Sequence, residues 1–177
     1  MSDLELIPFT SPQLKEPPKQ LDIEKEDLKA LKFELLQAMQ KFGGVGLSAN
    51  QVGIDKAYFV IGDGKPEGMQ KAFFNPLLIA VSDDEEVMRE GCLSFPGLWL
   101  MVNRPKQCTI LYHNSDGEEQ QETYEGIGAR VILHEYDHMV GQNFTQRVSK
   151  FKLERAFKAL EKKIKKYQRQ SKQLKQA

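Results

Sequence analysis

The sequence lacks the features that mark membrane and secreted proteins. It has no apolar run near the roughly 20 residues that a helix needs to cross a bilayer. The first twenty residues contain acids and prolines, with neither a basic start nor an apolar stretch. Only two cysteines are present, Cys92 and Cys108, too few for a disulfide framework. We therefore expect a cytoplasmic protein without a membrane segment.

The chain also lacks net charge, because 25 Lys and Arg balance 25 Asp and Glu. We therefore expect no DNA partner. The balance is local, however: residues 150–177 hold eleven Lys or Arg against two Glu. This segment predicts a basic C-terminal helix that can contact a polyanion such as RNA, and a plain solvated helix face is the competing interpretation.

The length of 177 residues suits one compact domain over 1–177, with the basic helix as part of it. Apolar residues at three- and four-residue steps predict a helix over 27–42 that ends at Gly43 and Gly44. Between residues 56 and 125, short β-rich runs (56–62, 71–81, 107–113 and 120–125) alternate with turn residues. The middle of the chain therefore predicts strands.

Two further helices are expected after the strands. Residues 127–140 are apolar almost all round, which is typical of a helix that runs through a core. The last segment carries an apolar stripe that we expect to pack on the body of the protein; its members are Leu153, Phe157, Leu160, Ile164 and Tyr167. Residues 1–20 are expected to form an arm without regular structure, because they contain four prolines.

The strongest chemical signal is HEYDH, His134 to His138. Positions i and i+4 of a helix lie on the same side, so both imidazoles can reach one metal ion while Glu135 projects toward a bound water. A chance pair of histidines on a solvated helix fits poorly, because the chain has only three histidines and this segment is too apolar to be solvated. The pattern indicates a hydrolytic metal site.

Two histidines leave such a site one protein ligand short if a position stays open for water. No histidine follows His138, and the nearest later acids, Glu154 and Glu161, lie on the basic helix. Cys92 in EGCLSFPG is the better third ligand, because a thiolate binds a borderline ion strongly. By itself a cysteine is more often a small buried hydrophobe, and Cys108 keeps that interpretation.

A third segment, GGVGLSANQVG over 43–53, carries weaker information. Its glycines at 43, 44 and 46 let the backbone come close to a ligand, and Gln51 supplies an amide that can donate to a carbonyl oxygen. A glycine-rich turn after a helix is usually only a helix stop. No lysine follows in the P-loop pattern, so we predict no phosphate site here.

Together, GVGLSANQ, EGCLS and HEYDH resemble the three ordered motifs of the peptide deformylase family, with similar spacing. The flanking helices also resemble that family's architecture. The resemblance implies an α+β fold of mixed antiparallel strands around a central metal-binding helix, with an N-terminal helix and a C-terminal amphipathic helix. It implies removal of the N-formyl group from the formylmethionine of newly synthesised polypeptides, with release of formate.

Carried over by motif, the resemblance makes Cys92, His134 and His138 the metal ligands and Glu135 the catalytic acid and base. The amide of Gln51 and the backbone N–H of Leu93 then bind the formyl oxygen. The implied cofactor is one divalent ion, usually Fe(II) in the family, with Zn, Ni or Co in its place. The implied substrates are N-formylmethionyl peptides. We expect a monomer whose basic helix docks weakly on ribosomal RNA.

The resemblance also implies a pocket for the methionine side chain, with the peptide backbone close to glycines. The residues expected at this pocket are Gly44, Val45, Gly46, Met88, Gly91, Ile127 and Val131. Among them, Val45 and Gly91 are expected to give backbone hydrogen bonds to an extended peptide. Glu90 and Arg104 are expected to form a salt bridge that holds the Cys92 loop, and two unrelated surface charges are the alternative.

Three positions depart from the commoner family pattern. Ser48 stands where alanine is frequent, which we expect to be a minor change. Arg130 lies one helical turn before His134, where many relatives have an apolar residue, and predicts a more polar rim of the methionine pocket. Trp99 stands where some relatives use a charged residue that reaches the substrate backbone. These changes concern side-chain preference and not the reaction.

Two other functions compete with deformylation on the sequence alone. The first is a zincin-type endopeptidase, which the H-E-x-x-H core favours and the cysteine motif disfavours. The second is a non-enzymatic module in which the ion stabilises the fold and the basic helix docks RNA. Glu135 and Gln51 argue against the module, because a structural metal site needs neither a base nor an open position.

Overall fold

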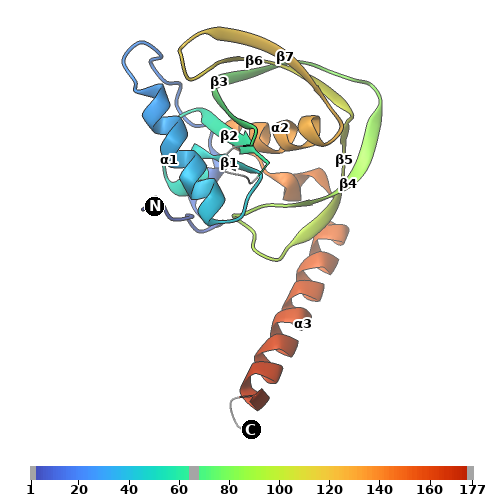
Figure 1. Cartoon of the computed structure of the whole chain (residues 1–177). Coiled ribbons are helices and arrows are strands. Elements are labelled where there is room, and N and C mark those ends of the chain that lie inside the picture. Colours follow the sequence, from blue (N-terminus) through green and yellow to red (C-terminus); the bar gives the residue numbers. More distant parts are fainter. Residues whose placement is uncertain (1–2, 64–67, 175–177) are drawn as a thin grey trace.

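A computed structural model describes residues 3–63 and 68–174 of the chain (Figure 1). The helices are α1 (Leu28–Lys41), α2 (Gly126–Met139) and α3 (Lys150–Leu174), with short 3-10 helices η1 (Pro12–Lys15), η2 (Ala49–Val52) and η3 (Phe144–Arg147). The strands are β1 (Gly46–Ser48), β2 (Tyr58–Gly62), β3 (Gln70–Val81), β4 (Glu85–Gly91), β5 (Trp99–Pro105), β6 (Gln107–His113) and β7 (Glu119–Glu125). No helix in the described ranges combines the length and the apolar character of a membrane span.

The strands form two antiparallel sheets. Five of them make one sheet in the order β1-β2-β3-β6-β7, and β4 pairs with β5 in a second sheet. Figure 1 shows α2 running between these sheets, while α1 covers the β1 and β2 end. This is the expected α+β arrangement of antiparallel strands around a central helix.

The main core lies where α1 and α2 meet the larger sheet. It includes fully buried side chains from α1, β2, β3 and α2, among them Leu35, Met39, Phe59, Phe73 and Ile132. Burying large apolar side chains is the dominant favourable term in folding. The central helix is therefore held firmly along its length, which suits a segment that carries functional side chains.

The predicted helices and strands are largely confirmed. The first helix begins at Leu28 because the carboxylate of Asp27 accepts a hydrogen bond from the Ala30 N–H at 3.0 Å. The predicted strand runs correspond to β2, β3, β6 and β7. Three strands were not predicted. β1 has only three residues, too few to show a pattern. Most of β4 is exposed, and β5 carries apolar side chains on both its buried and its exposed face, so neither strand shows a clear apolar alternation.

A second, smaller core joins the loop after β4 to the start of α3. Buried Cys92, Phe95, Leu98 and Phe144 contact partly buried side chains from the first turns of α3, which include Leu153, Phe157 and Leu160. Beyond Leu160 the helix leaves the body, as Figure 1 shows.

The expectation that the whole α3 stripe packs on the body is therefore wrong for its second half. Ile164 is 46% exposed and Tyr167 is 61% exposed, because no other element reaches that part of the helix within the described ranges. The basic helix predicted over 150–177 is observed as α3 over Lys150–Leu174, and residues 175–177 lie outside the described residues.

The N-terminal arm is more regular than its prolines suggest. The expectation of an arm without regular structure is wrong at Pro12–Lys15, which form η1 with proline at its start, where a missing N–H costs no hydrogen bond. Leu14 and Leu21 are buried. The arm therefore packs on the body of the protein.

Candidate metal centre

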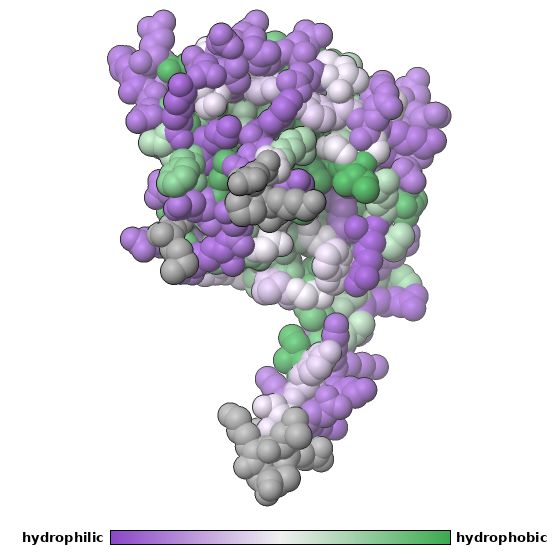
Figure 2. All heavy atoms as spheres, in the orientation of Figure 1, coloured by the Kyte–Doolittle hydropathy of each residue, from purple (hydrophilic) through white to green (hydrophobic). Residues whose placement is uncertain are grey.

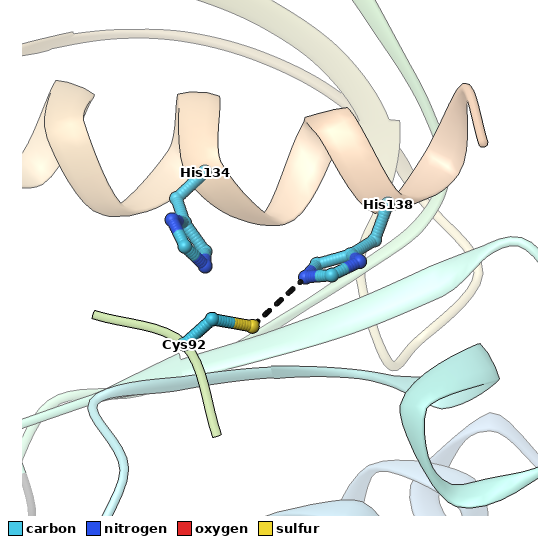
Figure 3. A group of neighbouring side chains, drawn as sticks. All are labelled: Cys92, His134 and His138. Atoms are coloured by element: carbon cyan, nitrogen blue, oxygen red, sulfur yellow. Dashed lines mark hydrogen bonds between the residues drawn. The ribbon is translucent and has the colours of Figure 1, made fainter. Parts of the chain in front are cut away.

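Cys92, His134 and His138 converge at one point (Figure 3). One ligand atom from each, a sulfur and two ring nitrogens, lies within 4.8 Å of the other two. The Cys92 Sγ is 3.5 Å from the His138 Nε2. All three residues are buried. A sulfur with two imidazoles is a donor set that suits a divalent transition-metal ion, so these residues fit the metal that the sequence predicted.

The backbone explains why residues so distant in sequence meet. His134 and His138 lie four residues apart on α2, so both rings project from one side of the helix, as Figure 3 shows. Cys92 follows directly after the end of β4, in a turn closed by the Phe95 N–H donating to the Cys92 carbonyl at 2.9 Å. Gly97 completes this loop with φ +79°, a conformation that favours glycine.

His134 is held by a buried group of charges. Its Nδ1 lies 3.0 Å from the Glu90 carboxylate, which also accepts from Arg104 at 2.7 and 2.9 Å and from Arg130 at 2.8 Å. Burial by itself raises the pKa of Glu90, but the hydrogen bonds from His134, Arg104 and Arg130 outweigh it and lower that pKa to about 2. Glu90 is thus a permanent carboxylate that fixes the ring of His134.

The same group of charges reaches the other end of the site. Arg104 also contacts Asp137 at 2.9 Å, and Asp137 forms a second ion pair with Arg147 of η3. The predicted Glu90 and Arg104 salt bridge is therefore present, and it belongs to a larger cluster. We call Glu90, Arg104, Arg130 and Asp137 the buried charge cluster, and Arg147, whose side chain is 43% exposed, pairs with it from η3. With Arg147, the cluster ties β4, β5, α2 and η3 together behind the ligands.

The pKa values of the two histidines are shifted in opposite directions. Burial, together with the positive charges of His134 and Arg104, lowers the pKa of His138 to about 3, so this ring is neutral and can bind a metal. Burial lowers the pKa of His134 as well, but hydrogen bonds to Cys92 and Glu90 outweigh it and raise that pKa to about 10. The negative groups that favour a proton on His134 equally favour a metal cation in its place.

Glu135 lies beside the ligands and is 4% exposed. Its carboxylate accepts a hydrogen bond from the Ser48 hydroxyl at 2.8 Å. A Cβ at Gly46 would lie 2.5 Å from Glu135 Oε1, so only glycine fits there. Burial raises the pKa of Glu135, although His134, Ser48 and Arg104 act in the opposite direction. A raised carboxyl pKa suits a group that both accepts and returns a proton.

Ser48, which we expected to be a minor change, makes a contact that the sequence did not indicate. Its hydroxyl connects the first motif to Glu135 in the third, across 87 positions of sequence. The spacing of motifs does not reveal such a contact, because it depends on how β1 packs against α2. Asn50 was missed for the same reason: its side-chain amide donates to the His138 carbonyl at 2.9 Å.

Hydrogen bonds at both the oxygen and the nitrogen of the Gln51 side-chain amide fix its orientation. Its Oε1 accepts from the Ser48 backbone N–H at 2.9 Å, which turns its Nε2 toward Cys92 Sγ at 3.3 Å and Ser94 Oγ at 2.9 Å. Within the described part of the chain, nothing accepts a hydrogen bond from the backbone N–H of Leu93. Two donors thus stand next to the metal ligands.

These groups open onto a cavity of about 700 Å³. Every residue predicted at the methionine pocket lines it, namely Gly44, Val45, Gly46, Met88, Gly91, Ile127 and Val131, together with Gln51, Cys92, Leu93, His134 and Glu135. Val45 and Ile127 are mostly exposed at its mouth. The three motifs therefore enclose a single cavity with Cys92 and His134 at its wall.

Arg130 and Trp99, the two side chains at this cavity that depart from the commoner family pattern, have different surroundings. Arg130 is buried, and its guanidinium donates hydrogen bonds to the Glu90 carboxylate, to the Val102 carbonyl at 2.8 Å and to the Glu86 carbonyl. Arg130 lines this cavity while its charge is compensated inside the protein, and the more polar rim stays a prediction. Trp99 lies over Gly91 at the mouth, with the Arg89 guanidinium 4.6 Å from its ring centroid.

The comparison with known families supports the same chemistry. A family model described as polypeptide deformylase matches residues 4–154, a span that contains all three motifs. The chain belongs to the polypeptide deformylase family. This membership decides between the interpretations that the sequence left open, against both the zincin-type endopeptidase and the module without enzymatic activity.

Individual peptide deformylases are similar to this chain over most of their length. The peptide deformylase of Pseudothermotoga lettingae is 38% identical over 133 residues, which cover 75% of this chain and 75% of that protein. That of Phenylobacterium zucineum is 35% identical over 165 residues and covers 92% and 97%. The crystal structure of a plant peptide deformylase superimposes with a TM-score of 0.84 at 34% identity, covering 96% and 94%.

The protein is thus a hydrolase that removes the N-formyl group from the N-terminal formylmethionine of nascent polypeptides and releases formate. Deformylase chemistry depends on a catalytic divalent metal, and the described residues contain a cysteine and two histidines that can hold one. The fold, the reaction and the need for a metal are therefore confirmed.

Proposed function

We propose that Cys92, His134 and His138 hold the catalytic ion and that this ion is Fe(II) in the cell, with Zn, Ni or Co able to replace it. The observation that supports the ligand set is the convergence of three buried donor atoms within 4.8 Å. When bound, the ion supplies a Lewis acid for the formyl carbonyl and lowers the pKa of water toward neutrality.

Glu135 is the general acid and base in this proposal. Its carboxylate accepts a proton from the attacking water and then donates that proton to the amine nitrogen of methionine as the C–N bond breaks. The products are formate and a free N-terminus. The Ser48 hydroxyl keeps the carboxylate in place, and the raised pKa makes the carboxylate a stronger base for taking the proton from water.

Gln51 and Leu93 stabilise the negative charge that develops on the formyl oxygen. The Leu93 N–H has no acceptor in the described part of the chain, so it is available to the substrate. The Gln51 amide donates to Ser94, and this bond gives way when the formyl oxygen arrives. Two fixed donors of this kind contribute on the order of 10²-fold each in acyl-transfer enzymes.

The formylmethionyl peptide binds between two strand edges. β1 is the edge strand of the larger sheet and β4 belongs to the two-stranded sheet, and both line the cavity. An extended peptide can add to such edges through backbone hydrogen bonds, which we expect Val45 and Gly91 to supply. The methionine side chain then contacts Met88, Ile127 and Val131.

The direct test is formate release from a formyl-Met tripeptide by protein purified without oxygen, together with metal analysis. Glu135→Ala should keep the metal and lose about 10²- to 10⁴-fold in kcat. Cys92→Ser should lose the metal as well as the activity, because a hydroxyl is a poor ligand for a transition-metal ion. Full activity of either variant would contradict the assigned roles.

We also propose that the protein acts as a cytoplasmic monomer and that α3 docks weakly on ribosomal RNA, where formylated chains emerge. The second half of α3 supports docking, since its basic side chains stand away from the body (Figure 2). A chain that ends at Ile164 should bind ribosomes less tightly in a sedimentation assay while its peptide turnover is unchanged. Equal binding of the shortened and the full chain to ribosomes would contradict the proposed docking.

A further inference from the structure

The N-terminal arm, defined here as residues 4–16, contacts the segments that carry all three motifs. Its first contact is with the GVGLSANQ segment, where the Ile7 N–H donates to the Gln51 carbonyl at 2.9 Å. Leu6 beside it lines the catalytic cavity. The arm therefore holds the backbone of the residue whose side-chain amide faces Cys92.

The second contact is with the loop that carries Cys92 and Leu93. The ring of Phe9 packs on the ring of Phe95, with centroids 5.1 Å apart. Phe95 packs in turn on Phe144 at 5.6 Å, and Phe144 on the His134 ring at 5.7 Å. A continuous row of rings thus leads from the arm to a metal ligand.

The third contact is with the end of α2, which carries the histidines. Gly141 adopts φ +69° directly after α2, and a Cβ there would lie 2.8 Å from the Lys15 carbonyl oxygen. The Gly141 N–H donates to the His138 carbonyl at 3.4 Å. The chain of the arm therefore runs against the turn that ends the metal-binding helix.

The arm is anchored at both ends. The Lys41 ammonium donates to the Leu4 carbonyl at 3.0 Å and pairs with Glu5, and Leu14 is buried. Between these anchors Leu6 packs against the main core, whereas Phe9 is 47% exposed and contacts Phe95 of the Cys92 loop. The contact of Phe9 therefore serves a catalytic segment more than the stability of the fold.

We propose that the N-terminal arm is a positioning element of the deformylase site. Ile7 and Phe9 fix the backbones of Gln51 and of the Cys92 loop relative to each other, so that the two donors, Gln51 and Leu93, meet the same oxygen. The inference rests on the proposed roles of these two donors. Catalytic geometry must hold within about 0.5 Å, and a misplacement of about 1 Å can cost 10²-fold in rate.

The test replaces Phe9 with Ala and compares it with Phe33→Ala, an exposed phenylalanine on α1 that is 64% exposed. Phe9→Ala should lower kcat about tenfold with less than about a twofold change in KM, and bound metal should stay the same. Phe9→Leu should recover part of the loss, and Phe33→Ala should match the wild type.

Hydrogen exchange gives a readout that does not depend on turnover. The Phe95 N–H, which donates to the Cys92 carbonyl, and the amides of η2 should exchange faster in Phe9→Ala, while those of α1 keep the wild-type rate. Ile7→Pro removes the N–H that binds Gln51 and should act in the same direction.

Three results would separate the possible failures. Unchanged kcat and unchanged exchange in Phe9→Ala and Ile7→Pro would overturn the positioning role. An equal loss in Phe33→Ala would overturn it too, because the effect would then be general. Faster exchange at Phe95 with unchanged kcat would keep the arm as a support of this loop and contradict instead the assignment of Leu93 as an oxyanion donor.

Discussion

Two regions of the molecule are rich in charge and use it in opposite ways. The buried charge cluster places four charged side chains behind the candidate metal ligands, where each ion is paired at a distance of 2.9 Å or less. The second half of α3 carries lysines and arginines that are exposed to solvent. Coulomb energy per pair is several times larger in the cluster than in water.

The difference lies in solvation. A buried charge is costly to leave unpaired, so every member of the cluster fixes the position of its neighbours, and His134 is one of the groups that it fixes. A solvated charge costs nothing to leave alone and fixes no neighbour, but it contributes to a field that attracts polyanions. Buried charge therefore positions residues, and exposed charge attracts partners.

The largest effect is expected for Glu90→Gln, which removes the central anion of the cluster. Arg104 and Arg130 then lose their shared partner, and a broken buried pair typically costs about 3–5 kcal/mol. We expect the free energy of unfolding in urea to fall by that amount and metal affinity to fall with it. A loss below about 1 kcal/mol would show that the cluster is not the rigid support described above.

Arg130→Met should have a smaller effect on the same region. The variant keeps the aliphatic stem, while Glu90 retains Arg104 and His134, but the carbonyls of Glu86 and Val102 lose a donor. We expect a loss of about 1–3 kcal/mol in urea unfolding. If Arg130→Met were as damaging as Glu90→Gln, Arg130 and not Glu90 would be the centre of the cluster.

Ser48→Ala tests a neutral contact at the same site. Removing the hydroxyl that donates to Glu135 at 2.8 Å should lower kcat about tenfold, which corresponds to about 1.4 kcal/mol. The matched control is Ser82→Ala on the turn between β3 and β4, which should keep wild-type kcat. Wild-type activity in both variants would return Ser48 to the minor role that the sequence suggested.

The smallest effect on folding is expected for the double change Lys162→Gln and Lys166→Gln on α3. Both side chains are exposed, so the free energy of unfolding should change by less than about 0.5 kcal/mol. Binding to ribosomes should weaken, and more so at low salt. A stability loss like that of Arg130→Met would mean that the exposed half of α3 is packed on the body after all.

Cys108 offers a check on the other cysteine. Burial raises its pKa to about 11, so its thiol stays protonated at neutral pH. A thiol-alkylating reagent at pH 7 should therefore leave Cys108 unmodified in the folded protein, as mass spectrometry can show, and modify it after unfolding. Rapid modification in the folded state would contradict its place in the core.

The candidate reactive residues could be predicted because each motif holds its reactive groups within a short segment of the sequence. HEYDH places two imidazoles and a carboxylate on one helical segment, and EGCLS supplies a sulfur that its motif distinguishes from Cys108. The strands with clear apolar alternation were predictable for the same reason. β1 and β4 were not, since one is too short to show a pattern and the other is exposed along most of its length.

The support of the site could not be read from the sequence. Arg130, Ser48 and the N-terminal arm gain their roles through contacts between segments far apart in the chain, such as Ser48 with Glu135 or Ile7 with Gln51. By itself the sequence determined the reaction and the central helix, and it predicts Cys92, His134 and His138 as the metal ligands. Only the tertiary structure decided what holds them in place, because that depends on which segments pack together in three dimensions.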